Sequence, residues 1–250
     1  SGLQGIDHRR LRPLPLAQAA KVRRALDEAG VAPGQRVLEI GCGWGAVAVA
    51  VAGERGAHLT GLTLSTEQLE FAQQRLGRAG LTDRTELRLQ DYRDLNDAPY
   101  DAVVSIEMFE AVGREYWPGF FNTVKQQLKP GGRACIQTIT IRDDLFDRYV
   151  KSTDFIQQYI FPGGLLPSPR EFALAAARAG LVVDKAMAFG PDSAETLRRW
   201  RARFHAQANA IRAQGFDEPF MRTWDLYLAY CEAAFDTGST DVVQFTLRHA

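Results

Sequence analysis

A glycine-rich turn directly after a short apolar segment is the strongest constraint on how this chain can fold. Residues 37–40 have the composition of a buried strand, and the letters GCGWG follow at 41–45. Three glycines in five residues remove the Cβ atoms that would keep a ligand away from the main chain. Small apolar residues at 46–52 continue as a helix with free N–H groups at its start. The pattern predicts close approach of a ligand, with a tight turn that binds nothing as the alternative.

Strands and helices alternate along the first 140 residues. The spacing predicts helices at 16–29, 46–52, 65–80 and 116–128, and strands at 37–40, 58–64, 85–89, 100–106 and 133–139. Ser65 is expected to cap its helix, with Gln68 three residues on. Five strands separated by helices predict right-handed crossovers and a parallel sheet with helices on both faces.

The alternation breaks after residue 140. Residues 141–169 are rich in aromatic and apolar side chains without a clear strand, so we expect an insertion that folds over the sheet. Further elements are predicted as a helix capped by Ser168, strands at 181–187 and 241–248, and helices at 194–214 and 218–235. With no repeat or linker in sight, residues 1–250 are interpreted as one domain. The segments 141–169 and 194–235 would cover its substrate.

Composition excludes several classes of function. The 250 residues include 30 basic and 30 acidic side chains, so the zero net charge leaves no electrostatic footprint for nucleic acid or for strong adhesion to anionic lipid. The three cysteines lack zinc-type spacing, so no metal site is expected and the thiols suit a reducing cytosol. The longest apolar run is far shorter than a membrane span. We expect a soluble cytoplasmic protein, with weak peripheral contact at the inner membrane face left open.

Two further segments should meet the glycine turn, because ligands of an open parallel sheet bind at the carboxyl ends of its strands. After the second strand, residues 61–65 offer hydroxyl groups and Gln68 offers an amide, where nucleotide-binding proteins that use NAD carry an acidic residue. After the third strand, Asp91 could accept a hydrogen bond from an adenine amino group and Tyr92 could lie against the ring. The alternative is that Asp91 only begins a turn.

Six segments in order resemble the S-adenosylmethionine-dependent methyltransferases, and more closely the family of cyclopropane-fatty-acyl-phospholipid synthases and mycolic acid cyclopropane synthases. They are VLEIGCGWG at 37–45, GLTLSTEQ at 61–68, QDYRDL at 90–95, SIEMFEAVG at 105–113, LKPGGRACIQTI at 128–139 and YIFPGGLLPS at 159–168. The resemblance implies a Rossmann-like class I methyltransferase fold with a mostly parallel seven-stranded sheet and a helical lid insertion. It implies S-adenosylmethionine contacts at Gly41, Cys42, Gly43, Trp44, Gly45, Thr63, Leu64, Gln68, Asp91 and Tyr92.

The chemistry implied by the resemblance takes place on the cis double bond of an unsaturated acyl chain, linked to a phospholipid or a carrier. The alkene takes the methyl group, a carbocation forms, and loss of a proton closes a cyclopropane. Such a cation needs an apolar pocket closed to water and a nearby base. Residues 155–166 are suitable material for a lid over that pocket. A homodimer is left open.

In the resembled family the base is a bicarbonate ion held by a glutamate, a histidine, a tyrosine, and the amides of a cysteine and an isoleucine. Glu110, Ile139 and Tyr227 match three of these, Gln137 stands where the histidine is expected, and residues 1–15 contain no match for the cysteine segment. Gln137 can donate an amide hydrogen but cannot carry positive charge. Either bicarbonate binds with altered partners, or another base acts and the product is a methylene or methyl-branched chain. Glu107 competes with Glu110 for one acidic role.

Two other hypotheses remain at this stage. The first is a methyltransferase for a soluble metabolite, with a polar pocket in place of an acyl tunnel. The second is a cofactor-binding subunit without catalysis of its own, which the histidine replacement makes plausible.

Overall fold

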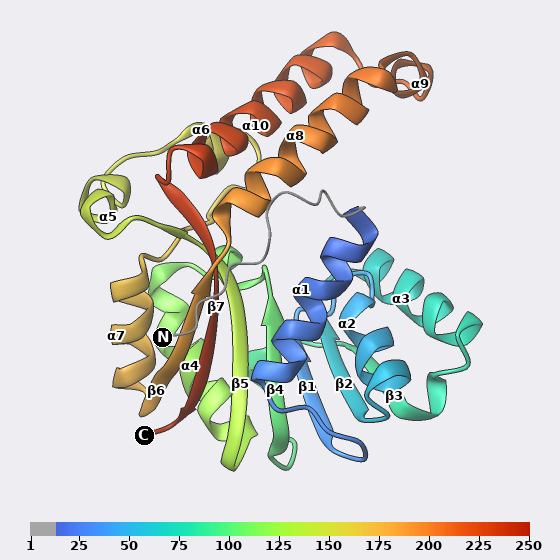
Figure 1. Ribbon diagram of the computed structural model, residues 1–250, viewed down its shortest axis with the longest axis vertical. Coiled ribbons are helices and arrows are strands. Elements are labelled where there is room, and N and C mark those ends of the chain that lie inside the picture. Colours follow the sequence, from blue (N-terminus) through green and yellow to red (C-terminus); the bar gives the residue numbers. More distant parts are fainter. Residues whose placement is uncertain (1–13) are drawn as a thin grey trace, which may run out of the picture.

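One open sheet organises the computed structural model, which describes residues 14–250. Its strand order is β3-β2-β1-β4-β5-β7-β6. All neighbours are parallel except β7, which is antiparallel to both β5 and β6. The strands are β1 (Arg36–Ile40), β2 (His58–Thr63), β3 (Thr85–Leu89), β4 (Tyr100–Ile106), β5 (Leu128–Ile141), β6 (Leu181–Ala188) and β7 (Thr240–His249). The predicted seven-stranded, mostly parallel sheet is confirmed (Figure 1).

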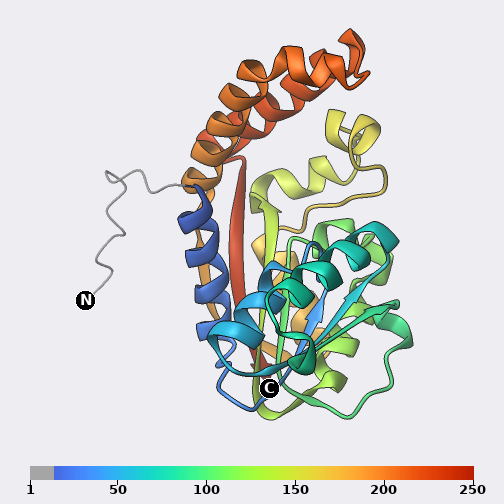
Figure 2. The same cartoon turned by 90° about the vertical axis from the view of Figure 1, so that its right-hand side faces the viewer.

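Helices cover both faces of this sheet, as the alternating pattern predicted. The helices are α1 (Leu14–Glu28), α2 (Ala46–Val49), α3 (Thr66–Arg78), α4 (Trp117–Gln127), α5 (Asp143–Tyr149), α6 (Phe155–Tyr159), α7 (Pro169–Arg178), α8 (Gly190–Ala206), α9 (Ala208–Ala213) and α10 (Glu218–Asp236). Side chains of α1, α2 and α3 pack on one face of the central strands. Those of α4, α5 and α7 pack on the other face. The ribbons of these helices are drawn in Figures 1 and 2.

Aromatic rings fill the core on the α4 and α7 side. Phe172 of α7 is fully buried and stacks on Phe245 of β7, with 4.0 Å between ring centroids. It also meets Phe109 and Phe121 edge-on at 5.3 and 5.0 Å. Since buried aromatic pairs add specific geometry to a large apolar area, this cluster fixes α7 against the sheet.

The order in which strands are added to the sheet reverses direction at β1. β1 pairs with β2 on one side and with β4 on the other, so successive crossovers leave in opposite directions. The carboxyl ends of β1, β2, β4 and β5 meet at one edge there. Helices α8 and α10 lie at the same edge, because α8 follows β6 and α10 precedes β7 (Figure 2).

Several predicted boundaries need correction. The helix expected at 194–214 begins at Gly190 and is interrupted at Gln207, whose φ of −101° and ψ of 10° separate α8 from α9. The strand expected at 133–139 starts earlier, because Leu128 pairs with Tyr100 ahead of a register shift. The insertion at 141–169 contains two short helices, α5 and α6. Ser65 caps α3 as predicted, accepting a hydrogen bond from the Gln68 amide at 3.2 Å.

The helices are too short or too polar to cross a bilayer. Across residues 14–250, none of them combines the length and the apolar character that such a span requires.

Truncation of the aromatic core should be costly for stability. We expect Phe172→Ala to lower the free energy of unfolding by about 3–5 kcal/mol, because it leaves a cavity among three rings. Urea denaturation measures the change. Phe216→Ala, at a side chain that is 44% exposed, is the matched control and should cost below about 1 kcal/mol. Equal losses in the two variants would contradict this account of the core.

Candidate active site

The glycine loop has a backbone conformation that favours glycine at three positions. Gly41, Gly43 and Gly45 all have positive φ, at 86°, 49° and 78°. A Cβ on Gly41 would lie 2.7 Å from the Met108 side chain, and one on Gly45 would lie 3.0 Å from Ala72 of α3. A Cβ on Gly43 would meet no atom within 4 Å. Two glycines are therefore needed for packing, and the third borders open space.

Hydrogen bonds divide the loop amides into used and unused groups. Gly41 and Cys42 both donate to the Leu62 carbonyl of β2, at 3.0 and 2.8 Å, and Gly45 donates to the Cys42 carbonyl at 3.0 Å. The N–H groups of Gly43 and Trp44 have no acceptor within residues 14–250. These two amides are free to bind a ligand. Cys42 supports the loop instead, since its thiol is buried and burial raises its pKa to about 12.

A buried carboxylate next to the loop was missed by the sequence analysis. Glu39 of β1 is 2% exposed, and its Oε2 has no hydrogen-bond partner in the described chain. Burial raises the pKa of this carboxyl well above its ordinary range. The signal in the sequence was a charged residue inside the apolar strand before the glycines. An unsatisfied acid here favours a ligand with a positively charged group.

The end of β2 carries the predicted polar groups. The Thr63 hydroxyl donates to Gln68 Oε1 at 3.1 Å and accepts from the Ser65 amide at 3.2 Å. This arrangement leaves the side-chain amide nitrogen of Gln68, Nε2, without a hydrogen-bond partner in residues 14–250. Leu64 is 73% exposed at the same edge. The structure therefore brings Thr63, Leu64 and Gln68 together.

The residues after β3 are more constrained than the sequence suggested. Asp91 begins a 3₁₀ turn and accepts from the amide of Arg93 at 2.9 Å and from its guanidinium at 2.7 Å. The Arg93 guanidinium holds the pKa of Asp91 below its usual range. Tyr92 packs edge-on against Phe120 of α4. The turn interpretation of Asp91 thus has direct support, and a ligand contact would be an additional role.

Trp44, which the resemblance implies as a cofactor contact, is only partly buried. It is 53% exposed, and its ring meets Phe71 of α3 edge-on at 5.3 Å. Its indole therefore borders solvent beside the free loop amides.

Glu110 and Ile139 are in direct contact, as the resemblance implied for one site. Glu110 lies in the 3₁₀ turn η4 (Phe109–Ala111), and its Oε1 accepts from the Ile139 amide at 2.5 Å. Its Oε2 is sealed from solvent without a hydrogen-bond partner in the described residues. Burial raises the pKa of Glu110 to about 7, and the nearby charge of Glu107 adds to the rise. This is the kind of perturbed acid found at catalytic sites.

Glu107 and Gln137 form the second polar contact of the site. Gln137 is fully buried on β5, and its Nε2 donates to Glu107 Oε1 at 2.6 Å. Lys21 of α1 pairs with the same oxygen at 3.1 Å. Among the described residues Glu107 is alone as a non-glycine with positive φ, at 55°. That conformation costs an L-residue about 1–2 kcal/mol, and such strain concentrates at functional sites.

Tyr227 completes the set from α10. It packs with Ile139 in a small cluster, and its ring lies 6.2 Å from Phe161 of the insertion and 5.0 Å from Trp224. Burial raises its pKa to about 12, with contributions from the Cys231 and Glu107 charges. Glu110, Gln137, Ile139 and Tyr227 therefore gather at one place. The cysteine segment of the resembled family had no match in residues 1–15, of which 1–13 lie outside the described residues.

A groove lies between the paired helices α8 and α10. It encloses about 420 Å³ and is lined by Trp200, Arg203, Phe204 and Gln207 of α8 and by Trp224, Tyr227 and Leu228 of α10. Aromatic side chains dominate its walls. Such a surface binds apolar ligands.

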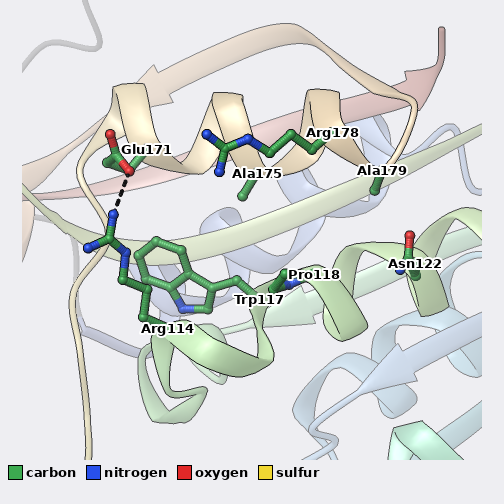
Figure 3. Close-up of a pocket in the computed structure, with 8 residues that line it drawn as sticks. All are labelled: Arg114, Trp117, Pro118, Asn122, Glu171, Ala175, Arg178 and Ala179. Atoms are coloured by element: carbon green, nitrogen blue, oxygen red, sulfur yellow. Dashed lines mark hydrogen bonds and ion pairs between the residues drawn. The ribbon is translucent and has the colours of Figure 1, made fainter.

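A separate crevice lies between α4 and α7. Figure 3 shows Arg114 reaching toward Glu171 across it, at 3.3 Å, with Arg178 and Asn122 further along. It encloses about 130 Å³, and none of the predicted site residues lines it. The candidate active site is therefore formed by the glycine loop at 41–45 and by Glu107 and Glu110 with their partners, and this crevice lies outside it.

Comparisons with known proteins find relatives over nearly the whole chain. A family model described as mycolic acid cyclopropane synthetase matches residues 9–245. The chain is 47% identical over 235 residues to the tuberculostearic acid methyltransferase UfaA1 of Mycobacterium tuberculosis, covering 94% of this chain and 55% of that protein. It is 38% identical over 223 residues to the cyclopropane-fatty-acyl-phospholipid synthase of Escherichia coli, covering 89% and 55%. The chain thus spans about half the length of these relatives.

Solved structures are similar over nearly the whole chain. The cyclopropane synthase MmaA2 from Mycobacterium tuberculosis superposes with a TM-score of 0.87 at 30% identity, covering 96% of this chain and 87% of that one. The mycolic acid cyclopropane synthase CmaA1, in complex with SAH and CTAB, has a TM-score of 0.83 at 31% identity, covering 94% and 85%.

Removal of the Glu110 carboxyl should change how stability depends on pH. The folded state raises the pKa from its ordinary 4.5 to about 7, so it binds this proton more tightly than the unfolded chain does. Wild-type stability should therefore fall relative to Glu110→Gln as the pH rises from about 4.5 to 8, by on the order of 3 kcal/mol. Urea denaturation of both proteins across this range measures the difference. A difference that is constant with pH would contradict the assignment.

Proposed function

The chain belongs to the mycolic acid cyclopropane synthetase family, and we propose that it transfers a methyl group from S-adenosylmethionine to the cis double bond of an unsaturated acyl chain. Its fold is the class I methyltransferase fold, which alone leaves the substrate open. The substrate assignment rests on the residues of the site.

The glycine loop fits S-adenosylmethionine. The unused amides of Gly43 and Trp44 would bind its polar parts, and the open space at Gly43 admits a ligand against the backbone. The orphaned Glu39 carboxylate suits a cationic ligand. Thr63, Gln68 and Asp91 would hold the nucleoside. When bound, this cofactor supplies an electrophilic methyl group.

The single observation that carries the substrate assignment is the aromatic groove between α8 and α10, which Tyr227 helps to line. Tyr227 lines the groove, packs against the same apolar cluster as Ile139 and feels the charge of Glu107, so we infer that an acyl chain in the groove extends toward the acidic residues. Burial of each methylene stabilises the bound chain by about 0.8 kcal/mol. Ten enclosed carbons would therefore contribute on the order of 8 kcal/mol to the binding free energy, before the entropy cost of ordering the chain is subtracted. A soluble polar metabolite would gain little from such walls. The groove therefore favours the acyl substrate over the metabolite alternative.

The covering segments would exclude water from the reaction. Phe161 meets Tyr227, and Phe155 of α6 meets Tyr230 of α10 at 6.2 Å between ring centroids. These contacts join the insertion at 141–169 to the helices within 194–235. We assign both segments to the substrate cover of a single domain. A carbocation formed beneath them would be shielded from hydrolysis.

A second candidate product is a methylene-branched chain. The similarity to a tuberculostearic acid methyltransferase favours it, as does Gln137 in place of the expected histidine. Both products require the same methyl transfer. They differ in whether the carbocation closes directly to a ring or first undergoes a hydride migration before the proton is lost. The cytoplasmic location, contact with the inner membrane face and a homodimer stay predictions.

Lipid mass tests the proposed activity. Incubation with S-adenosylmethionine and a phospholipid carrying a cis-monounsaturated chain should increase the chain mass by one methylene. A saturated phospholipid is the control and should not change, because it has no alkene. Gas chromatography of the released chains distinguishes a ring from a methylene branch. Absence of turnover on phospholipid-, carrier- and thioester-linked chains would reject the acyl assignment.

Gly43→Ala tests the cofactor loop against Gly34→Ala, a matched control. Both glycines have positive φ and no atom within 4 Å of the position that a Cβ would take, so both variants should lose about 1–2 kcal/mol of stability. Only the methyl group at Gly43 would obstruct the ligand. We expect its affinity for S-adenosylmethionine to fall at least about tenfold, a change of about 1.4 kcal/mol. Calorimetry on the two proteins measures this, and equal affinities would contradict the loop assignment.

A further inference from the structure

We propose that the carboxylate of Glu107 is the base of the reaction, in the position that the family resemblance assigns to bicarbonate. This inference rests on the proposed function and deepens it. It follows from the hydrogen bonds that the donor groups of the site already make to the two glutamates.

Two groups expected to hold bicarbonate donate to carboxylates of the chain itself. The Ile139 amide donates to Glu110 Oε1 at 2.5 Å, and Gln137 Nε2 donates to Glu107 Oε1 at 2.6 Å. Gln137 has no free end, because its Oε1 accepts from Gln244 at 3.0 Å. The protein thus supplies its own anions to the donors that an external anion would need.

A chain of amides fixes the direction of these hydrogen bonds. Arg24 of α1 donates to Gln244 Oε1 at 2.7 Å, which leaves Gln244 Nε2 to donate to Gln137 Oε1. Gln137 must then present its Nε2 to Glu107. A neutral histidine would also carry one donor and one acceptor, but it titrates near neutral pH, whereas the glutamine amide keeps both groups at any such pH. The glutamine is therefore matched to a carboxylate partner.

The position of Glu107 suits a base. It lies between the end of β4 and Glu110. Its backbone is left-handed, and all other described residues with positive φ are glycines. Lys21 and Gln137 both contact Oε1, so Oε2 has no protein partner in residues 14–250 and can accept a proton. Its side chain is 48% exposed in the ligand-free structure, so the proton can pass to solvent once the acyl product has left the site.

Glu110 is less suited to this step. Its Oε1 is held by the Ile139 amide, and its Oε2 is sealed from water. A proton taken there could not leave without movement of the turn. We assign Glu110 to positioning of β5 at the site.

The proton transfer balances without another reactant. After the alkene has taken the methyl group, one C–H bond of that methyl breaks. Its electron pair forms the C–C bond that closes the ring, and the proton binds Glu107 Oε2. Glu107 then releases the proton to water and returns to its starting state. For a methylene product, the same C–H electron pair forms the exocyclic double bond after hydride migration along the chain.

Bicarbonate dependence separates an internal base from an external one. In buffer depleted of carbon dioxide, the wild type should convert the cis-monounsaturated phospholipid at the same rate with and without added bicarbonate. Glu107→Gln keeps the size of the side chain but cannot accept a proton, and should lose roughly a hundredfold or more in rate. Glu115→Gln, at an exposed residue outside the site, is the matched control and should keep the wild-type rate.

The Glu107→Gly variant is the decisive one. Glycine accepts the positive φ and opens the space of the carboxylate, so the rate should fall as in Glu107→Gln but recover in part with bicarbonate, and further in Glu107→Gly/Gln137→His. Full activity of Glu107→Gln, or a wild type that requires bicarbonate, would overturn the proposal. Loss confined to Glu110→Gln would assign the base to Glu110 instead.

Binding of carbon-13-labelled bicarbonate gives a readout that does not depend on turnover. By nuclear magnetic resonance, the wild type should not bind the labelled ion at this site, whereas Glu107→Gly should bind it. Saturable binding by the wild type that Gln137→Ala abolishes would overturn the proposal even if no lipid were converted. Failure of the acyl assignment would appear only in the lipid assay, so the two failures are distinguishable.

Discussion

The site depends on the contact between Gly41 and Met108. Gly41 follows β1 and Met108 follows β4, and there is no space for a Cβ between them. Because these strands are neighbours at the reversal of strand order, no helix separates their carboxyl ends. The loop that fits the cofactor and the segment that carries two acids are thereby packed as one unit. Every later feature of the site, from Ile139 to Tyr227, is placed relative to this unit.

Three carboxylates converge on this edge of the sheet in a chain with no net charge. Glu39 is buried beside the loop, Glu110 is sealed against β5, and Glu107 pairs with Lys21. Unpartnered oxygens on the first two are costly in the ligand-free fold. A sulfonium reactant and a carbocation are both positively charged, so either would lower the raised pKa of these two acids, whose ionised oxygens would then stabilise the positive charge. Electrostatic preorganisation of this kind is usually a large part of catalysis.

Much of this arrangement was accessible from the sequence because it depends on local periodicity. The alternation of apolar segments predicted the sheet, and the glycine spacing predicted the turn after β1 in which Gly41, Gly43 and Gly45 have positive φ. The partners of side chains were harder. The Asp91 carboxylate accepts hydrogen bonds from Arg93, two residues along the chain. The orientation of Gln137 is set by a hydrogen bond from Gln244, 107 positions along the chain. The left-handed conformation of Glu107 has no signature in its residue type. Such features come from tertiary packing, which a single sequence does not display.

The way in which α8 and α10 join the sheet has a consequence for how this scaffold can diversify. The helical pair enters from β6 and returns to β7, two strands paired side by side at the rim of the sheet. Turns could be added to or deleted from both helices together while the connections to those strands stayed in register. The length of hydrocarbon that is accommodated could then change across descendants of one ancestor without disturbance of the catalytic centre.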